Sequence, residues 1–266
     1  MTTPIALTIA GSDSGGGAGI QADLKTFAAL GVYGASVITA LTAQNTRGVR
    51  GVHPVPPDVV TAQLGAVFDD LAVGAVKIGM VASRGLIEAI AAGLACWIPG
   101  HVVLDPVMVA TSGDKLLAED AVDGLRRLLI PRATLITPNL PEAAALLGDT
   151  VATSEAAIAD QGRRLLGLGC PAVLIKGGHG EGAESTDYLI TSDATLPLTS
   201  PRLATRNTHG TGCSLSSAVA AGLAKGEDLA SAVRSAKIFI TDAIAAADRF
   251  TVGHGHGPVH HFHRFY

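Results

Sequence analysis

The chain of 266 residues has few aromatic side chains and little charge. Phe, Trp and Tyr make up 4% of it, with Trp97 as the one tryptophan, and charged residues make up 16%. Hydrophobic residues nevertheless make up 48%, so the core must be built from Ala, Val, Leu and Ile. Such a composition excludes intrinsic disorder and predicts a large buried core.

The sequence also lacks a basic excess, a long apolar run and a cysteine pattern. The 19 Lys and Arg against 23 Asp and Glu give a net charge of −4, which leaves no electrostatic footprint for nucleic acid or an anionic membrane. No apolar run reaches the ~18 residues of a membrane span, and the first residues lack the basic region of a signal peptide. Three widely separated cysteines, Cys96, Cys170 and Cys213, suggest free thiols in a reducing compartment. We therefore expect a soluble, cytoplasmic enzyme.

Glycine, by contrast, is abundant, with 32 residues against roughly 7% in average usage. Fourteen of them fall in four short segments, 11–19, 177–182, 210–212 and 253–257. Three of these segments adjoin the ends of predicted strands or the start of a predicted helix. They predict backbone that approaches a phosphate group or closes over a substrate.

Short apolar runs alternate with helical patterns along the chain. Strands are predicted at 5–11, 35–44, 75–80, 101–107, 133–139 and 172–178, and helices at 18–30, 59–71, 83–97, 119–129, 141–147, 154–168, 212–224 and 229–247. A hairpin is predicted from 187–192 and 194–200, and the tail after 251 is predicted to be irregular. Because these strands are apolar on both faces, 1–266 is predicted to be a single α/β domain. Its central, mostly parallel sheet would lie between two layers of helices.

Polar residues follow the predicted strands, where open parallel sheets bind their ligands. We expect them to meet at one edge of the sheet. They are Gly11 to Asp13, Gln44 and Asn45, Gly79 and Met80, Asp105 and Pro106, Asn139 with Glu142, and Lys176 to Gly178.

The segment NTHGTGC (207–213) is the strongest local signal, since it leads directly into an Ala-rich helix. Gly210 and Gly212 would let helix N–H groups approach a phosphoryl group closely. Cys213 falls in the first turn, where the helix dipole favours a thiolate that could take a proton from a hydroxyl. The alternatives are a glycine-rich helix start that binds nothing and a small cysteine that only packs.

The glycine loop GSDSGGGAG (11–19) fits neither the dinucleotide-binding nor the P-loop pattern. It could be a plain flexible loop. Alternatively, it closes over a small polar substrate, with Asp23 facing inward from the following helix.

Carboxylates and a lysine at strand ends indicate a cation and an anion at the same edge. Asp105 and Glu142 suit Mg²⁺, which proteins bind through one or two carboxylates together with phosphates. Asn139 could instead be a helix cap, and Glu142 could lie on a solvated face. Lys176 ends an apolar strand, where a lysine usually meets an anion.

Five of the nine histidines lie in the tail, at His254, His256, His260, His261 and His263. Clustered histidine invites a metal site. However, no cysteine or carboxylate accompanies them, and the spacing fits no common site.

Taken together, these motifs resemble a known family. NTHGTGC resembles the anion-hole signature of ribokinase-like kinases, with Cys213 in place of the usual aspartate. AGSDSGGGAGIQADLKT, TALTAQNT, KIGM, DPVMVATSG, TPNLPEA, IKGGH, HGTGCSLSSA and the tail GHGPVHHFH resemble the hydroxymethylpyrimidine/phosphomethylpyrimidine kinases of thiamine biosynthesis. The resemblance covers essentially the whole chain and implies a three-layer αβα ribokinase-like fold and a dimer.

The resemblance also implies a reaction and roles for residues. ATP would phosphorylate the hydroxymethyl group of 4-amino-5-hydroxymethyl-2-methylpyrimidine and then the resulting monophosphate. The implied substrate-binding residues are Gln44, at the aminopyrimidine edge, with Gly11, Asp23, Met80 and Val107. Asp105 and Glu142 would serve Mg²⁺, while Lys176, Asn139 and Thr208 would bind ATP. The residues Gly210, Thr211, Gly212 and Cys213 would form the anion hole, with Cys213 as base.

Two alternatives remain open at this stage. A pyridoxal kinase or a mixed-specificity vitamin kinase would use the same anion hole, because pyridoxal also presents a hydroxymethyl group on a nitrogen heterocycle. A ligand-binding protein without catalysis would need the pocket but no base. The combination of Asp105, Glu142, Lys176 and Cys213 argues against that second alternative.

Overall fold

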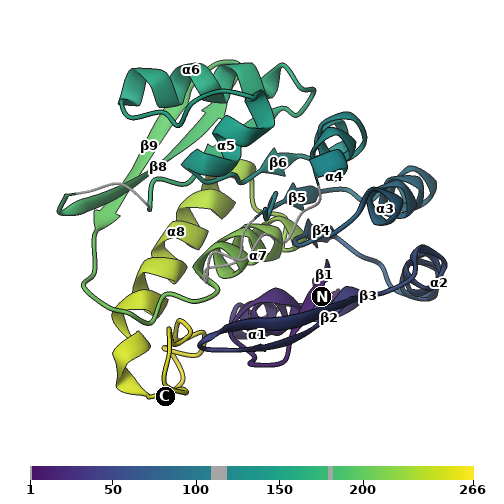
Figure 1. Ribbon diagram of the computed structural model, residues 1–266, viewed down its shortest axis with the longest axis horizontal. Coiled ribbons are helices and arrows are strands. Elements are labelled where there is room, and N and C mark those ends of the chain that lie inside the picture. Colours follow the sequence, from purple (N-terminus) through teal and green to yellow (C-terminus); the bar gives the residue numbers. More distant parts are fainter. Residues whose placement is uncertain (1, 109–118, 179–181) are drawn as a thin grey trace.

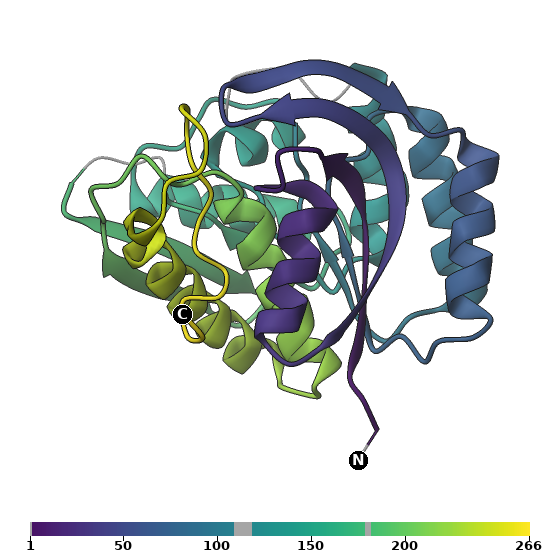
Figure 2. The same ribbon diagram turned by 90° about the horizontal axis from the view of Figure 1, so that it is seen from below.

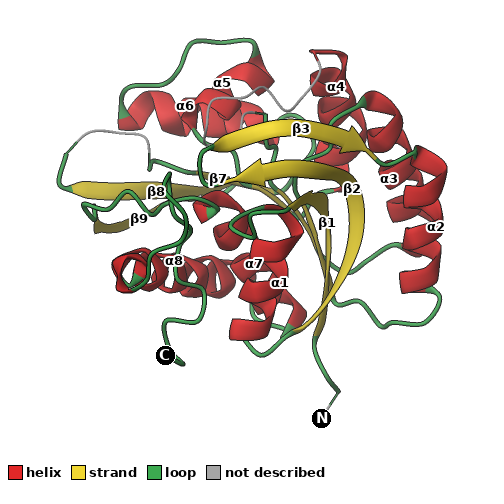
Figure 3. Ribbon diagram, turned by 60° about the horizontal axis from the view of Figure 1, so that its bottom comes forward, coloured by secondary structure: helices red, strands yellow, loops and turns green. Residues whose placement is uncertain are grey.

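The computed structural model describes residues 2–108, 119–178 and 182–266. Within these ranges the strands form one sheet in the order β3-β2-β1-β4-β5-β6-β7-β8-β9 (Figures 1 and 3). The strands are β1 (Ile5–Asp13), β2 (Tyr33–Asn45), β3 (Gly48–Pro54), β4 (Ala75–Ile78), β5 (Val102–Leu104), β6 (Leu135–Ile136), β7 (Ala172–Ile175), β8 (Glu184–Thr191) and β9 (Thr195–Pro201). From β2 to β7 neighbouring strands are parallel, while β3, β8 and β9 pair antiparallel.

Helices cover both faces of this sheet, which gives the three predicted layers (Figures 1 and 2). One face carries α1 (Gly19–Ala29), α7 (Thr211–Ala224) and α8 (Leu229–Ala245). The other carries α2 (Pro57–Phe68), α3 (Arg84–Trp97), α4 (Glu119–Gly124), α5 (Leu140–Leu147) and α6 (Glu155–Leu166). The α/β fold expected from the sequence is therefore confirmed.

Strand residues alternate between the two faces and build two different cores. Leu7, Ile9, Val76 and Ile78 pack toward α2 to α6, while the smaller Ala6, Ala75 and Ala172 pack toward α7 and α8. The residues of helix α7 in this second core are also small. They include Ala218, Ala220 and Ala221, which are all at most 3% exposed. Small side chains on both partners let this helix approach the sheet closely, so its first turn is held at the strand ends.

Three parts of the chain differ from the prediction. The predicted helix at 119–129 ends at Gly124 and continues as a π-helical turn, Leu125–Leu129, followed by a 3₁₀ turn, Ile130–Arg132. Strand β3 was not predicted, because its sequence GVRGVHP is mostly exposed and lacks an apolar alternation. The predicted helix 229–247 ends at Ala245 and is followed by a 3₁₀ turn, Ala247–Arg249. The tail after 251 is irregular as predicted, apart from a bridge between Pro258 and His209.

Three predicted segments lie partly outside the described residues, DPVMVATSG, IKGGH and the glycine segment 177–182. Residues 109–118 contain most of DPVMVATSG, and 179–181 interrupt the glycine segment 177–182. Among the described residues, no helix is both long and apolar enough to cross a membrane.

Candidate active site

A cavity of about 750 Å³ lies at the carboxyl ends of the parallel strands, beside the first turn of α7. Every group of strand-end residues expected at this edge contributes to its lining, which confirms that prediction. The predicted site residues in the lining are Gly11, Gln44, Met80, Asp105, Val107, Asn139, Glu142, Lys176, Thr208, Gly210, Thr211, Gly212 and Cys213.

Helix α7 begins at this cavity with a turn that only glycine makes easily. Gly210 precedes the helix with φ 80° and ψ 7°, in the left-handed region. A side chain there would also overlap the carbonyl oxygen of Gly17. The Thr211 hydroxyl donates to the carbonyl of Thr208 at 2.7 Å and closes the turn. The first N–H groups of a helix lack intrahelical acceptors, so this turn presents a binding site for an anion.

Lys176 and two carboxylates lie against the same turn. Lys176 Nζ is 2.7 Å from Asp105 Oδ1 and 3.9 Å from Glu142 Oε2. A Cβ atom on Gly212 would lie 3.3 Å from Lys176 Nζ and 3.7 Å from Asp105 Oδ2. Within the protein, the negative charges that contact Lys176 are therefore the carboxylates of Asp105 and Glu142, and Asp105 lies close to the α7 turn.

The charges of this cluster do not balance, and that affects Glu142. Burial raises the pKa of Glu142, and the nearby Asp105 adds to the rise, although Lys176 opposes it. For Lys176, burial opposes charge, but Asp105 and Glu142 outweigh it and raise the pKa of the lysine. Two carboxylates around one ammonium leave room for a further positive charge.

Asn139 and Glu142 cap helix α5 together. The Asn139 side chain accepts from the N–H of Glu142, and the Glu142 carboxylate accepts from the N–H of Asn139, both at 2.8 Å. The alternative that Asn139 is a helix cap is correct. The alternative of a solvated Glu142 is wrong, since this residue is 7% exposed and lines the cavity.

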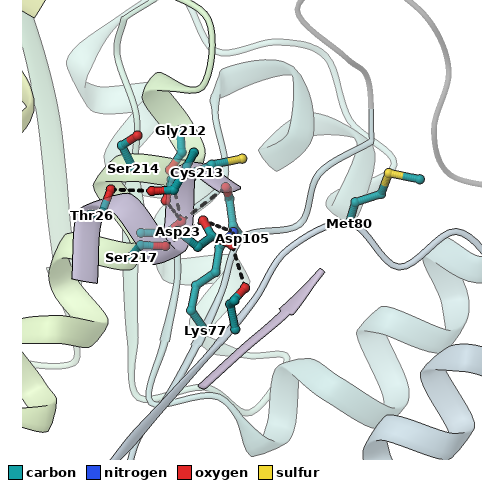
Figure 4. Close-up of polar contacts among 12 residues, drawn as sticks. Asp23, Thr26, Lys77, Met80, Asp105, Gly212, Cys213, Ser214 and Ser217 are labelled. Atoms are coloured by element: carbon teal, nitrogen blue, oxygen red, sulfur yellow. Dashed lines mark hydrogen bonds and ion pairs between the residues drawn. The ribbon is translucent and has the colours of Figure 1, made fainter. Parts of the chain in front are cut away.

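The prediction that Asp23 lines the pocket is wrong. Asp23 is fully buried behind the cavity wall, where Figure 4 shows it facing Lys77 and Ser217. It accepts from Lys77 Nζ at 2.8 and 2.9 Å, from Thr8 at 2.6 Å and from Ser217 at 2.7 Å. A carboxylate buried on the inner side of α1 needs such partners to stay charged.

Lys77 is a cavity residue that sequence reasoning missed. It is fully buried in β4 and lies in the cavity wall, next to Asp105 and Cys213 (Figure 4). Although burial opposes its charge, Asp23 and then Cys213 and Asp105 raise the pKa of Lys77. The available signal was a lysine inside the otherwise apolar strand AVKI.

The prediction of a thiolate at Cys213 is also wrong for the chain by itself. Burial raises the pKa of Cys213 to about 11, against the lowering effect of Lys77. The carboxylates of Asp23 and Asp105 add to this rise. Desolvation outweighs the lowering effects of Lys77 and of the Gly19 backbone, so the thiol is protonated near neutral pH.

The glycine loop after β1 is held by Asp13 rather than free. The Asp13 carboxylate accepts from the backbone N–H groups of Gly15, Gly17 and Ala18 at 2.8 to 3.1 Å. His209, in the turn before α7, lies 3.0 Å from the same carboxylate. Sequence reasoning assigned no role to Asp13 or His209, because 196 positions separate them.

The tail histidines pack instead of converging. His261 Nε2 lies 2.9 Å from the Ser214 hydroxyl in the first turn of α7, and His260 packs edge-on against Phe250. Within the described residues, no group of three or more His, Cys, Asp or Glu could hold a metal ion.

Known proteins share both this sequence and this fold. Residues 13–260 match the family model described as phosphomethylpyrimidine kinase. A hydroxymethylpyrimidine/phosphomethylpyrimidine kinase of Rhizobium meliloti (strain 1021) is 59% identical over 264 residues, which cover 99% of each chain. Among solved structures, an ADP complex of Bacillus subtilis pyridoxal kinase is 37% identical, with a TM-score of 0.91 and full coverage of both chains. A phosphomethylpyrimidine kinase from Clostridium difficile 630 is 45% identical, with a TM-score of 0.80, over 90% of this chain and 99% of that one.

Proposed function

The chain belongs to the phosphomethylpyrimidine kinase family, and on that premise we propose its reaction. It transfers the γ-phosphoryl group of ATP to the hydroxymethyl group of 4-amino-5-hydroxymethyl-2-methylpyrimidine. A second transfer to the resulting monophosphate gives the diphosphate, for thiamine biosynthesis. The observation that supports this most directly is that Asp105, Glu142, Lys176 and the start of α7 line one cavity.

Phosphoryl transfer depends on positioning and on stabilising charge, more than on covalent help from the protein. The N–H groups at the start of α7 would stabilise charge on the phosphoryl group as it moves. Lys176 would add a positive charge beside them. Asn139 and Thr208, which line the same cavity, would bind ATP. Gln44, Gly11, Met80 and Val107 would enclose the pyrimidine.

The donor set fits Mg²⁺. Asp105 and Glu142 are both buried, and among the described residues Lys176 is the lysine that contacts both of them. Oxygen ligands with unbalanced negative charge are what Mg²⁺ prefers when it also binds phosphates. A bound magnesium ion would neutralise phosphate charge, and these two carboxylates would hold it.

Cys213 is proposed as the group that takes the proton from the substrate hydroxyl. Because its thiol is protonated near neutral pH, it must first lose that proton. The Lys77 ammonium favours the thiolate and reduces this cost. We also propose that the protein is a homodimer, which the family resemblance supports. A cytoplasmic location is proposed as well, which the free cysteines support.

The test is to incubate the purified protein with the aminopyrimidine and Mg-ATP and to follow the products by mass spectrometry. We expect the monophosphate first and the diphosphate later, with neither formed when Mg²⁺ is chelated. Absence of both products from a folded protein would refute the proposed function. Monophosphate alone would refute the second transfer.

A further inference from the structure

The glycine loop after β1 contacts both Gln44 and the turn before α7. Asp13, Ala18 and Gly19, at the two ends of this loop, line the cavity, and so do Gln44 and His209. Nothing in the proposed phosphoryl transfer uses Asp13 or His209. The inference below rests on the proposed function, because it concerns how the pyrimidine side of the cavity, at Gln44, is placed relative to the anion-binding turn.

The loop is bound to β2 at Gln44. The Ser14 hydroxyl donates to the carbonyl of Gln44 at 2.7 Å, and the N–H of Gln44 donates to the same hydroxyl oxygen at 2.9 Å. A serine hydroxyl has one hydrogen to donate and lone pairs to accept with, so both bonds form together. The loop therefore holds the backbone of the residue that is proposed to face the pyrimidine.

Asp13 gives the loop a defined shape. Three consecutive glycines, Gly15 to Gly17, leave its backbone many possible conformations. The Asp13 carboxylate accepts from the N–H groups of Gly15, Gly17 and Ala18, which selects one of them. Burial opposes charge on Asp13, but the bonds from His209 and from the backbone of Gly15 and Ala18 prevail and lower its pKa. The carboxylate is therefore ionised near neutral pH.

His209 joins this loop to the turn before α7. Its Nε2 atom lies 3.0 Å from Asp13 Oδ2. Because an ionised carboxylate can only accept, the hydrogen on this nitrogen is donated to Asp13. The tail holds the backbone of His209, since His209 N donates to Gly257 O at 3.0 Å and Val259 N donates to His209 O at 3.3 Å. The buried histidine is thus fixed at its backbone and at its ring.

The loop and the α7 turn also touch through their backbones. A side chain on Gly17 would overlap the His209 ring, and a side chain on Gly210 would overlap the Gly17 carbonyl oxygen. The backbone of Gly19, where the loop ends, contacts Cys213 in the first turn of α7. A shift of the loop relative to the turn would therefore move the two sides of the cavity apart.

We propose that Asp13 and His209 are positioning residues that hold the pyrimidine side of the cavity at a fixed distance from the anion-binding turn. Gln44 is bound to the loop, the loop is bound to His209, and His209 directly precedes the turn. Each side can bind its own ligand alone, but transfer requires the hydroxyl oxygen and the phosphoryl group close together and in line. A displacement of about 1 Å can lower the rate by about 100-fold. The pair therefore acts on kcat rather than on binding.

A matched pair of variants at His209 tests this proposal. His209→Gln keeps an N–H near the position of His209 Nε2, and His209→Met has a similar length without a donor. We expect His209→Met to lower kcat about tenfold, with both KM values near those of the wild type, and His209→Gln to keep most of kcat. Calorimetric titration with the aminopyrimidine alone, and with the ATP analogue AMP-PCP alone, measures the two sides separately.

Three results would overturn the inference while the proposed function stands. They are a wild-type kcat in His209→Met, a His209→Gln variant as slow as His209→Met, and a loss of binding of either ligand as large as the loss of kcat. The last would show a merely structural role, because the sites themselves would be damaged. If the wild-type enzyme does not phosphorylate the aminopyrimidine at all, the proposed function fails and the inference fails with it.

A second variant acts at the other contact of the loop and does not depend on His209. Ser14 is exposed, so Ser14→Ala leaves the core intact but removes both bonds to the Gln44 backbone. Ser14→Thr keeps the hydroxyl and is the control. We expect Ser14→Ala to lower kcat at least about threefold, with AMP-PCP binding unchanged. A wild-type kcat in Ser14→Ala contradicts the proposal.

Discussion

At the scale of single residues, burial decides the charge states around the cavity. Asp23 and Lys77 are both fully buried and charged because they pair, while Cys213 beside them stays protonated. A sequence shows which residues can ionise, but not how much solvent they lose. This is why the position of Asp23 and the charge state of Cys213 were predicted incorrectly, and why Lys77 was missed.

The Asp23–Lys77 pair should be costly to break. Lys77→Met leaves the Asp23 carboxylate buried without its cation, so we expect a loss of about 3–5 kcal/mol in the free energy of unfolding. Urea denaturation measures it. Adding Asp23→Asn to Lys77→Met should recover part of the loss, because the neutral amide needs no cation. A single variant as stable as wild type would contradict the importance of the pair.

Cys213 should give the reaction a dependence on alkaline pH. Since its pKa is raised to about 11, the thiolate fraction grows tenfold per pH unit above neutrality. If the thiolate takes the hydroxyl proton, kcat should rise between pH 7 and pH 10. Cys213→Ala should lose most turnover and this rise, but keep pyrimidine affinity. Wild-type kcat in Cys213→Ala would show that Cys213 is not the base.

At the scale of elements, the start of α7 joins the fold to the chemistry. Its glycine turn, its Ala-rich face and the anion-binding prediction were all visible in the sequence, because they are local patterns. The tail that supports it was not, since its contacts with Asn207, His209 and Ser214 join distant positions. Strand β3 was not predicted for a similar reason, because it depends on its pairing with β2.

The two glycines of the α7 turn should respond differently to alanine. Gly210 has positive φ and touches the Gly17 carbonyl, so Gly210→Ala should destabilise the protein by over about 1 kcal/mol. Gly212→Ala would place its methyl group beside Lys176 and Asp105. It should leave the melting temperature near the wild-type value but reduce phosphoryl transfer. Calorimetry and a kinetic assay on both variants measure this, and the reverse pattern would contradict the assignment.

The tail should make stability sensitive to acid. Burial lowers the pKa of His261 to about 3, so between that value and 6.5 the unfolded chain binds a proton that the folded chain does not. The free energy of unfolding should therefore fall with decreasing pH over this window, by on the order of 1 kcal/mol per unit. His261→Asn should show a shallower slope in pH-dependent urea denaturation. An equal slope in both proteins would exclude His261 as the cause.

At the scale of the whole molecule, one edge of a parallel sheet collects residues from six separate strands. That convergence followed from the alternation of strands and helices, so the site was predictable as a place. The hydrogen bonds within it were not, because they depend on side-chain geometry. Asp13 and His209, which hold the glycine loop and face Gln44, are the clearest case.

We expect the enzyme to phosphorylate an aminopyrimidine in preference to other vitamin alcohols. Pyridoxal is the informative competitor, since a solved pyridoxal kinase shares the fold over the full chain. The decisive measurement is kcat/KM of the wild-type enzyme for each alcohol at saturating Mg-ATP, followed by ADP release. We expect a large preference for 4-amino-5-hydroxymethyl-2-methylpyrimidine. Equal or faster turnover of pyridoxal would contradict it.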